Sequence, residues 1–178
     1  MKYLVFSDIH GSFHYGSMIK NIIEIEKSDK LILLGDLYYH GPRNPLPKEY
    51  APMEVCKLLN SMKDSLVAIR GNCDAEVDEM ISEFKFNSDY VVEINGKTFW
   101  FTHGHKYNID NIPENVDFLV YGHFHTGYIK EKDNVVCVNA GSMSLPKNNT
   151  PHSYVVITEE EVLLKDIDGN LIDKVQIK

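Results

Sequence analysis

The sequence has few cysteines, no long apolar run and fewer basic than acidic residues. Three cysteines, Cys56, Cys73 and Cys137, occur in 178 residues without any Cys-x-x-Cys spacing. A disulfide framework or a thiolate zinc site is therefore not expected. No apolar stretch approaches the ~18 residues of a membrane helix, and the N-terminus runs directly into an expected strand without space for a signal peptide. These features predict a cytoplasmic protein that does not enter a membrane.

The formal charge of -8 excludes a further class of partners. Nonspecific binding to nucleic acid or to an anionic membrane depends on a basic face, so neither is expected. A phosphate-containing substrate would have to be held by something other than bulk charge, and bound metal would serve. The length and the 43% apolar content predict one globular domain over residues 1–178, with the number of subunits left open.

Apolar runs alternate with amphipathic segments in the first half of the chain. Strands are expected at residues 2–7, 30–36 and 66–71, and helices at residues 12–28, 52–62 and 75–84. Residues 37–52 contain four of the seven prolines, which predicts a long loop. Loops at strand ends are where binding pockets are commonly built.

The second half of the chain has the pattern of antiparallel strands. Asn95-Gly96 is a strong signal for a hairpin that joins residues 90–94 to residues 97–102. Further strands are expected at residues 118–121, 127–132, 135–139, 153–158, 161–167 and 171–177. This order predicts an α/β protein in which two sheets pack face to face with helices outside.

Polar side chains follow five of the expected strands at the points where these strands end. They are Asp8 and His10, then Asp36, Asn72 and His103, and finally His123 and His125. One such residue is ordinary, but seven at five strand ends indicate a site, because ligands bind outside the carboxyl ends of strands in open α/β sheets. Asp8 with His10, and His123 with His125, would share a face if the backbone were extended there.

This mixed set of nitrogen and oxygen donors suits manganese, iron, zinc or magnesium better than copper or calcium. Seven donors would overfill one ion. Two ions sharing Asp36 would each have about four protein ligands, with positions left for a bridging hydroxide and for substrate oxygens.

Five sequence blocks in fixed order resemble the calcineurin-like metallophosphoesterases, and most of all the small bacterial YfcE-type phosphodiesterases. They are S-D-I-H-G (7–11), G-D (35–36), G-N-C-D (71–74), T-H-G-H (102–105) and G-H-F-H (122–125), extended by H-G-P-R-N (40–44) and N-A-G-S (139–142). The likeness covers nearly the whole chain. It implies a four-layer α-β-β-α sandwich of two packed mixed sheets with flanking helices.

The resemblance also implies a binuclear phosphodiesterase acting on a small phosphodiester by in-line attack of a metal-bridging hydroxide. It assigns Asp8, His10 and His125 to the first metal, Asp36 to both, and Asn72, His103 and His123 to the second. Two divalent ions are expected, Mn²⁺ first, with Fe, Zn, Ni or Mg open. An inactive or weakly active metal-binding scaffold for protein contacts, as known in this fold family, and a phosphomonoesterase are the alternatives.

Two residues depart from the pattern of the resembling family. Cys73 stands where most relatives have a histidine that protonates the leaving oxygen, although the YfcE-type branch also has cysteine. Loss of a general acid, typically ~10²–10⁴ in rate, predicts strong dependence on the leaving group. Phe124 stands where threonine is frequent and is expected to point away from the metals.

Several residues near the blocks have roles that the sequence leaves open. His105 is expected to assist proton transfer or bind a ligand, or else to be an ordinary loop residue. Tyr38, Tyr39 and Arg43 are expected to wall the pocket and meet the substrate, with packing under the loop as the alternative for the tyrosines. Asp74 would orient a neighbour or cap the helix at residues 75–84.

Overall fold

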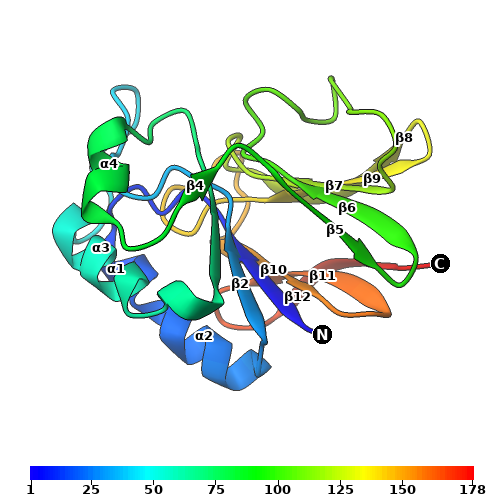
Figure 1. The fold of residues 1–178 in the computed structure, drawn as a ribbon, viewed down its shortest axis with the longest axis horizontal. Coiled ribbons are helices and arrows are strands. Elements are labelled where there is room, and N and C mark those ends of the chain that lie inside the picture. The colour runs from blue at the N-terminus through cyan, green and yellow to red at the C-terminus, as the bar shows by residue number, and fades with distance from the viewer.

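The computed structural model describes residues 1–178 as two β-sheets packed face to face (Figure 1). The seven-stranded sheet consists, in spatial order, of β12 (Leu171–Gln176), β11 (Glu161–Asp166), β10 (Ser153–Ile157), β1 (Tyr3–Phe6), β2 (Lys30–Leu33), β3 (Leu66–Ile69) and β4 (Phe86–Asn87). The five-stranded sheet consists of β5 (Tyr90–Ile94), β6 (Lys97–Phe101), β7 (Phe118–Tyr121), β9 (Val135–Ala140) and β8 (Gly127–Lys132). The predicted strands are therefore confirmed, and only the short β4 was not predicted.

Strand direction places the important strand ends together. β1, β2 and β3 are parallel neighbours in one sheet, and β6 and β7 are parallel neighbours in the other. The predicted hairpin at Asn95-Gly96 is confirmed, and both turn residues have positive φ, as a tight two-residue hairpin turn requires. The N-terminus lies at the opposite end of β1 from the segment that leads to α1 (Figure 1).

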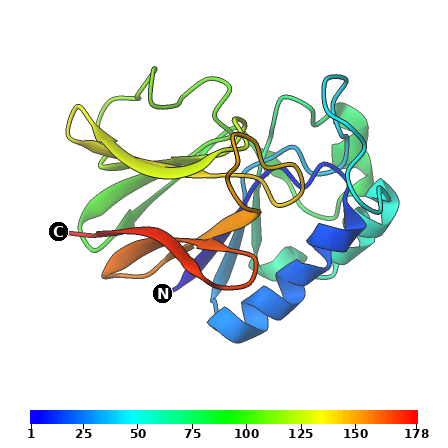
Figure 2. The ribbon, with the colours of Figure 1, turned by 180° about the vertical axis from the view of Figure 1, so that it is seen from behind.

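The helices lie on one side of the molecule, against the outer face of the seven-stranded sheet (Figure 2). They are α1 (Phe13–Gly16), α2 (Met18–Glu26), α3 (Pro52–Asn60), a 3₁₀ turn (Lys63–Ser65) and α4 (Glu76–Ile81). The helix predicted over residues 12–28 is two helices that meet at Ser17, whose hydroxyl donates to the His14 carbonyl. The long loop predicted between β2 and α3 is confirmed.

The outer face of the five-stranded sheet is covered by chain without helix. Side chains from the segment between β6 and β7, including Tyr107 and Ile112, pack on the buried Leu119 and Tyr121. The prediction of two packed mixed sheets is confirmed, but the expected flanking helices are present on one side only. This face buries only four core residues, so a loop is enough to cover it.

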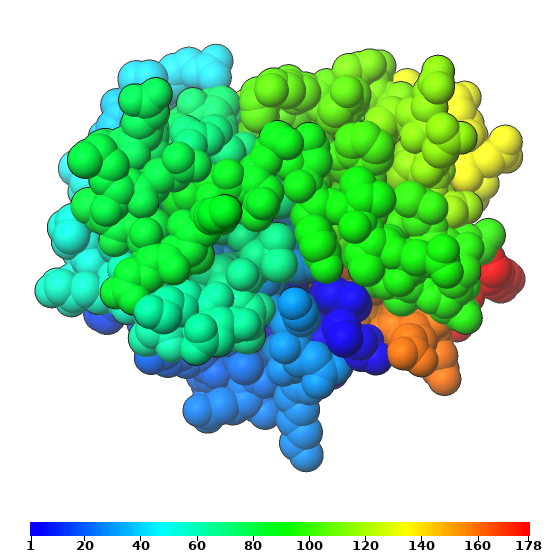
Figure 3. Space-filling view, viewed as in Figure 1, coloured from blue at the N-terminus to red at the C-terminus, as the bar shows by residue number.

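The space between the sheets is filled by the larger apolar core, in which the rings of Phe99 and Phe118 stack with centroids 4.3 Å apart. Burying each such side chain stabilises the fold by about 1.5–3 kcal/mol. In Figure 3 the N-terminal residues and the β10–β11 hairpin emerge side by side, as the pairing of β1 with β10 requires. None of the helices combines the length and apolarity needed to cross a bilayer.

Candidate metal centre

The seven side chains predicted from strand ends converge on one place. Each follows a parallel strand: β1 leads to Asp8 and His10, β2 to Asp36, β3 to Asn72, β6 to His103, and β7 to His123 and His125. Backbone hydrogen bonds tie these strand ends together, for example from the Asp8 and His10 N–H groups to the carbonyls of Gly35 and Asp36. The parallel direction of the strands is what brings the side chains to one edge.

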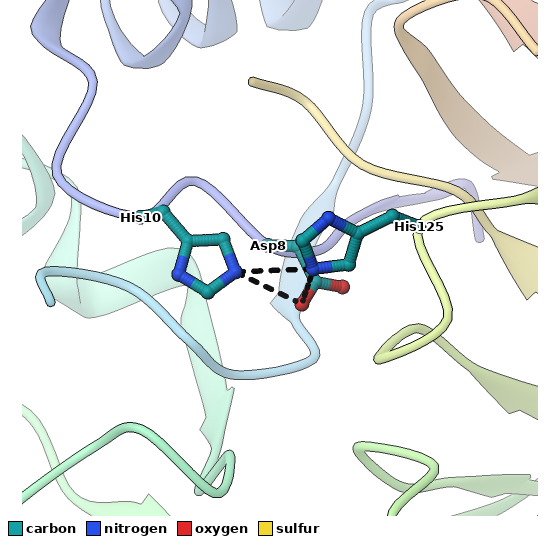
Figure 4. Close-up of side chains that lie close together, drawn as sticks. All are labelled: Asp8, His10 and His125. Atoms are coloured by element: carbon teal, nitrogen blue, oxygen red, sulfur yellow. Dashed lines mark hydrogen bonds and ion pairs between the residues drawn. The ribbon is translucent and has the colours of Figure 1, made fainter. Parts of the chain in front are cut away.

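Asp8, His10 and His125 form one group of donors (Figure 4). The Nε2 atoms of His10 and His125 are 3.1 Å apart, and Oδ1 of Asp8 lies 3.1 Å from Nε2 of His125 and 3.5 Å from Nε2 of His10. All three side chains are buried. The second carboxylate oxygen of Asp8 accepts from the Ser7 hydroxyl and from the His123 N–H, so only Oδ1 faces the group.

Asn72, His103 and His123 form the second group. Nε2 of His103 lies 2.9 Å from Oδ1 of Asn72 and 3.2 Å from Nδ1 of His123. Asp36 stands between the two groups, because Oδ2 is 3.7 Å from Nε2 of His10 and Oδ1 is 3.5 Å from Nε2 of His103. One carboxylate therefore presents an oxygen to each group.

Three histidines are held in the orientation that a metal ligand needs. Each approaches a backbone carbonyl at 2.7 Å through Nδ1: His10 that of Tyr39, His103 that of Leu34, and His125 that of Leu145. A carbonyl only accepts, so Nδ1 carries the proton and the Nε2 lone pair points into the site. This is the usual arrangement around metal-binding imidazoles.

An unpaired carboxylate oxygen also indicates that these donors would hold divalent cations. Oδ1 of Asp8 is buried and has no hydrogen-bond partner, which is costly for a carboxylate oxygen unless a positive charge faces it. A cation there would satisfy this oxygen together with the Nε2 atoms of His10 and His125. The mixed nitrogen and oxygen donors exclude no first-row divalent ion by themselves.

The conformation of the ligand loops differs from the expectation. Asp8, His10, His123 and His125 all have φ between 49° and 64°, so the backbone is left-handed and not extended. The explanation by alternation along an extended chain was therefore wrong, although the side chains do converge. For the same reason Phe124 is not turned away from the site: its ring packs on His123 and lines the cleft beside the ligands.

Comparison with known proteins decides the family. The model of the calcineurin-like phosphoesterase superfamily domain matches residues 1–162. The chain belongs to this superfamily. The prediction of the family is thus confirmed, and a phosphoesterase of this family implies divalent metal ions.

The relatives include proteins matched over nearly their full length. The chain is 36% identical to Phosphodiesterase YfcE of Escherichia coli K12 over 163 residues, 90% of this chain and 89% of that protein. It is 26% identical to the probable metallophosphoesterase YsnB of Bacillus subtilis, over 99% and 97% of the two chains. The solved structure of YfcE from E. coli superposes with a TM-score of 0.96 at 34% identity, covering both chains fully.

A more distant structure shares the fold alone. Vacuolar Protein Sorting 29 from Cryptosporidium parvum superposes with a TM-score of 0.64 at 16% identity, covering 99% and 97% of the two chains. The likeness shows that this sandwich is shared by proteins of different sequence. It carries no information about activity.

The glycines that directly precede the ligands His123 and Asn72 allow other ligand-carrying segments to approach the backbone closely. A Cβ at Gly122 would overlap Oγ of Ser7 and the Asp8 carboxylate, and one at Gly71 would overlap the Asp36 carboxylate. The G-N and G-H pairs of the sequence thus have a steric cause, since only glycine leaves room for the carboxylate of the adjoining segment.

Asp74 organises the loop that carries Asp36. Its carboxylate accepts from the N–H groups of Asp36 at 2.7 Å, Leu37 at 2.8 Å and Gly71 at 2.7 Å. It does not cap α4, whose N-cap is Ala75, so the helix-cap interpretation was wrong. Burial and the charge of Asp36 raise the pKa of Asp74 to about 6, against these three donors, which lower it.

Two residues of the N-A-G-S block hold the loops that carry the ligands. Asn139 donates to the carbonyl of Gly122, next to His123, and the Ser142 hydroxyl donates to the carbonyl of Asp8 at 2.8 Å. Both residues are fully buried.

Charges within the site perturb the protonation of the ligands. Burial opposes charge on His103, but the Asp36 and Asp8 carboxylates outweigh it and raise the pKa of His103 to about 9. Burial and the charge of His103 lower the pKa of His123 to about 4. Bound cations would displace protons from these imidazoles, because only the neutral ring is a ligand.

A cleft of about 830 Å³ opens beside the ligands. Tyr39 and Arg43 line it, as does Cys73, where burial and the Asp36 charge raise the pKa of the thiol to about 12. Tyr38 does not line this cleft: it is buried and its hydroxyl bonds Ser82, which agrees with the packing alternative. His105 also does not line it, although its ring lies 5.4 Å from that of His103.

Some residues of the cleft were not found by sequence reasoning. Asn44, Phe124 and Lys147 complete its wall, together with two prolines and two small residues: Pro42, Pro45, Gly41 and Ala75. Asn44 lies within the H-G-P-R-N block, which carries a signal. Lys147 lies in a loop that carries no recognisable sequence signal. Its position depends on a backbone hydrogen bond to the carbonyl of His125.

Proposed function

We propose that this phosphoesterase is a phosphodiesterase with two divalent cations, held by Asp8, His10 and His125 on one side and by Asn72, His103 and His123 on the other, with Asp36 shared. The observation that supports the proposal most is the placement of the Asp36 carboxylate, with one oxygen toward each donor group. The activity follows the name of the E. coli relative, Phosphodiesterase YfcE. Mn²⁺ is proposed as the first ion to test.

When bound, the two cations supply activation of water and neutralisation of charge on the phosphoryl oxygens. The chain's own residues position the reaction. Asp74 and Ser142 fix the loops that carry Asp36 and Asp8, so the carboxylates are oriented before substrate arrives. The Asn72 amide turns its oxygen to His103 and its NH₂ group toward Cys73, at the cleft.

The test is hydrolysis of bis(p-nitrophenyl) phosphate with and without Mn²⁺. The wild-type protein should hydrolyse the diester in a Mn²⁺-dependent way, and Asn72→Ala and His123→Ala should each reduce kcat by at least about 100-fold. Asn21→Ala and His14→Ala serve as matched controls, because neither residue lines the cleft, and both should retain wild-type rates.

Binding of two cations without any hydrolysis would contradict the proposal and favour the scaffold alternative. Preference for p-nitrophenyl phosphate over the diester would instead favour a phosphomonoesterase. A metal titration followed by calorimetry distinguishes failure to load the ions from failure to react.

A further inference from the structure

The cleft and a hollow beside it differ in chemistry. The hollow, of about 290 Å³, adjoins the cleft and shares Tyr39, Cys73 and Ala75 with it. The other residues around the hollow are Tyr38, Tyr50, Pro52, Val77 and Asp78. The Asp78 carboxylate is already bonded to the Ala75 N–H, so the hollow offers mainly aromatic and aliphatic surface.

The wall of the cleft carries two cationic side chains, Arg43 and Lys147. Lys147 is placed beside His125, because its N–H donates to the His125 carbonyl at 2.8 Å. Lys147 lines the cleft together with Arg43, and both side chains are exposed. Neither side chain forms an ion pair with a carboxylate of the chain, so both charges are free to meet a ligand in the cleft.

The balance of charge in the cleft is opposite to that of the whole chain. The protein carries a formal charge of -8, yet the only carboxylate lining the cleft is that of Asp36, which faces the donor groups. Two free cations on the wall therefore present a local positive field at the mouth of the site. A guanidinium and an ammonium are the groups that bind carboxylates and phosphates.

We infer that the substrate is an unsymmetrical phosphodiester. One of its two alcohol groups is apolar and occupies the hollow beside Cys73. The other alcohol group bears a second anionic group, which faces Arg43 and Lys147. The inference rests on the proposed phosphodiesterase function and goes beyond it by specifying the charge of the two halves. The wall has no carboxylate to receive a cationic alcohol, so such diesters are poor substrates.

Three p-nitrophenyl diesters test the inference with the leaving group held constant. Their second alcohols are 2-carboxyethyl, 3,3-dimethylbutyl and choline; the last two have the same shape and differ only in charge. KM should be lowest for the carboxyethyl diester and should rise by about threefold to tenfold at each step to dimethylbutyl and to choline. Raising the ionic strength should weaken this order, because exposed charges are screened.

Variants test the cationic side chains and the hollow separately. In a combined Arg43→Gln and Lys147→Gln variant the KM values of the three diesters should converge. Val77→Asn, at an exposed position that lines the hollow, should raise KM for all three diesters alike and keep their order. Lys20→Gln removes an exposed lysine of α2 that does not line the cleft and should match wild type.

Each outcome decides a different statement. Equal KM for the three diesters, or a preference for the choline diester, overturns the inference but leaves the phosphodiesterase function standing. A charge preference that survives in the Arg43→Gln and Lys147→Gln variant overturns the assignment to these residues. KM values that do not change in Val77→Asn overturn the statement that the hollow binds the apolar alcohol. Absence of hydrolysis of all three, and of bis(p-nitrophenyl) phosphate, instead overturns the proposed function.

Discussion

His103 follows a strand of the five-stranded sheet but is fixed by the seven-stranded sheet, because its Nδ1–H donates to the carbonyl of Leu34 at 2.7 Å. Leu34 is two residues before Asp36, and His103 lies 3.5 Å from the Asp36 carboxylate. The metal centre therefore spans the interface of the two sheets. Its geometry depends on how the sheets pack and not only on the loops.

Replacement of the shared carboxylate should affect both donor groups. We expect Asp36→Asn to retain the fold but to lose at least about 100-fold in kcat on bis(p-nitrophenyl) phosphate, because the amide offers only one oxygen. Calorimetric titration should show that Mn²⁺ binds more weakly and no longer at two sites. Asp64→Asn, at an exposed aspartate of the 3₁₀ turn, is the control. Two undisturbed sites in Asp36→Asn would refute the shared role.

The loop that holds Asp36 is expected to be sensitive to Asp74. In Asp74→Asn one acceptor oxygen is replaced by a donor, so at least one of the three N–H groups of Asp36, Leu37 and Gly71 loses its partner. Metal affinity should fall by about 10- to 100-fold while the α4 helix stays intact. Metal titration with circular dichroism separates these effects. Unchanged affinity would mean that the loop is held by other contacts.

The cysteine at position 73 should make the rate depend on the leaving group. A series of aryl and alkyl phosphodiesters should show activated aryl esters reacting fast and alkyl esters slowly, since a positioned general acid is typically worth ~10²–10⁴. Cys73→His should reduce the difference in rate between aryl and alkyl phosphodiesters. Equal rates for aryl and alkyl diesters in the wild-type protein would contradict the prediction.

Glu26 links three elements far from the metal centre. Its carboxylate accepts from Lys2 at 2.7 Å, Lys165 at 2.6 Å and the Tyr154 hydroxyl at 3.1 Å, and only 7% of the side chain is exposed. Burial raises the pKa of Glu26, but Lys165, Lys2 and Tyr154 outweigh it, so the pKa lies below its ordinary value of 4.5.

The sign of the pH effect follows from this lowered pKa. The stabilisation by Glu26 is fully present above the unfolded pKa near 4.5 and is lost as the pH falls through the lower folded pKa. We expect Glu26→Gln to reduce the free energy of unfolding by about 1–3 kcal/mol at pH 7, and the difference from wild type to shrink below pH ~4.5. Urea unfolding at several pH values measures this difference in the free energy of unfolding. Glu54→Gln, at an exposed glutamate, is the control. A difference that does not depend on pH would contradict this.

The alternation of apolar runs and polar strand ends was enough to predict the two sheets, the order of strands and helices along the chain, and the seven metal-capable residues. Such features depend on local patterns, because a buried strand is apolar along its length and a ligand must follow where the strand ends. Asp36 could be placed in the site for this reason without knowledge of its neighbours.

Only the tertiary structure decided which surfaces those residues face. The left-handed backbone at Asp8 and His123 was not readable, because non-glycine residues adopt it only when surrounding contacts impose it. The positions of Lys147 and Phe124 in the cleft, and the buried role of Tyr38, likewise depend on contacts between segments distant in sequence. The sequence thus determined the chemistry of the site, and packing of the two sheets determined its shape.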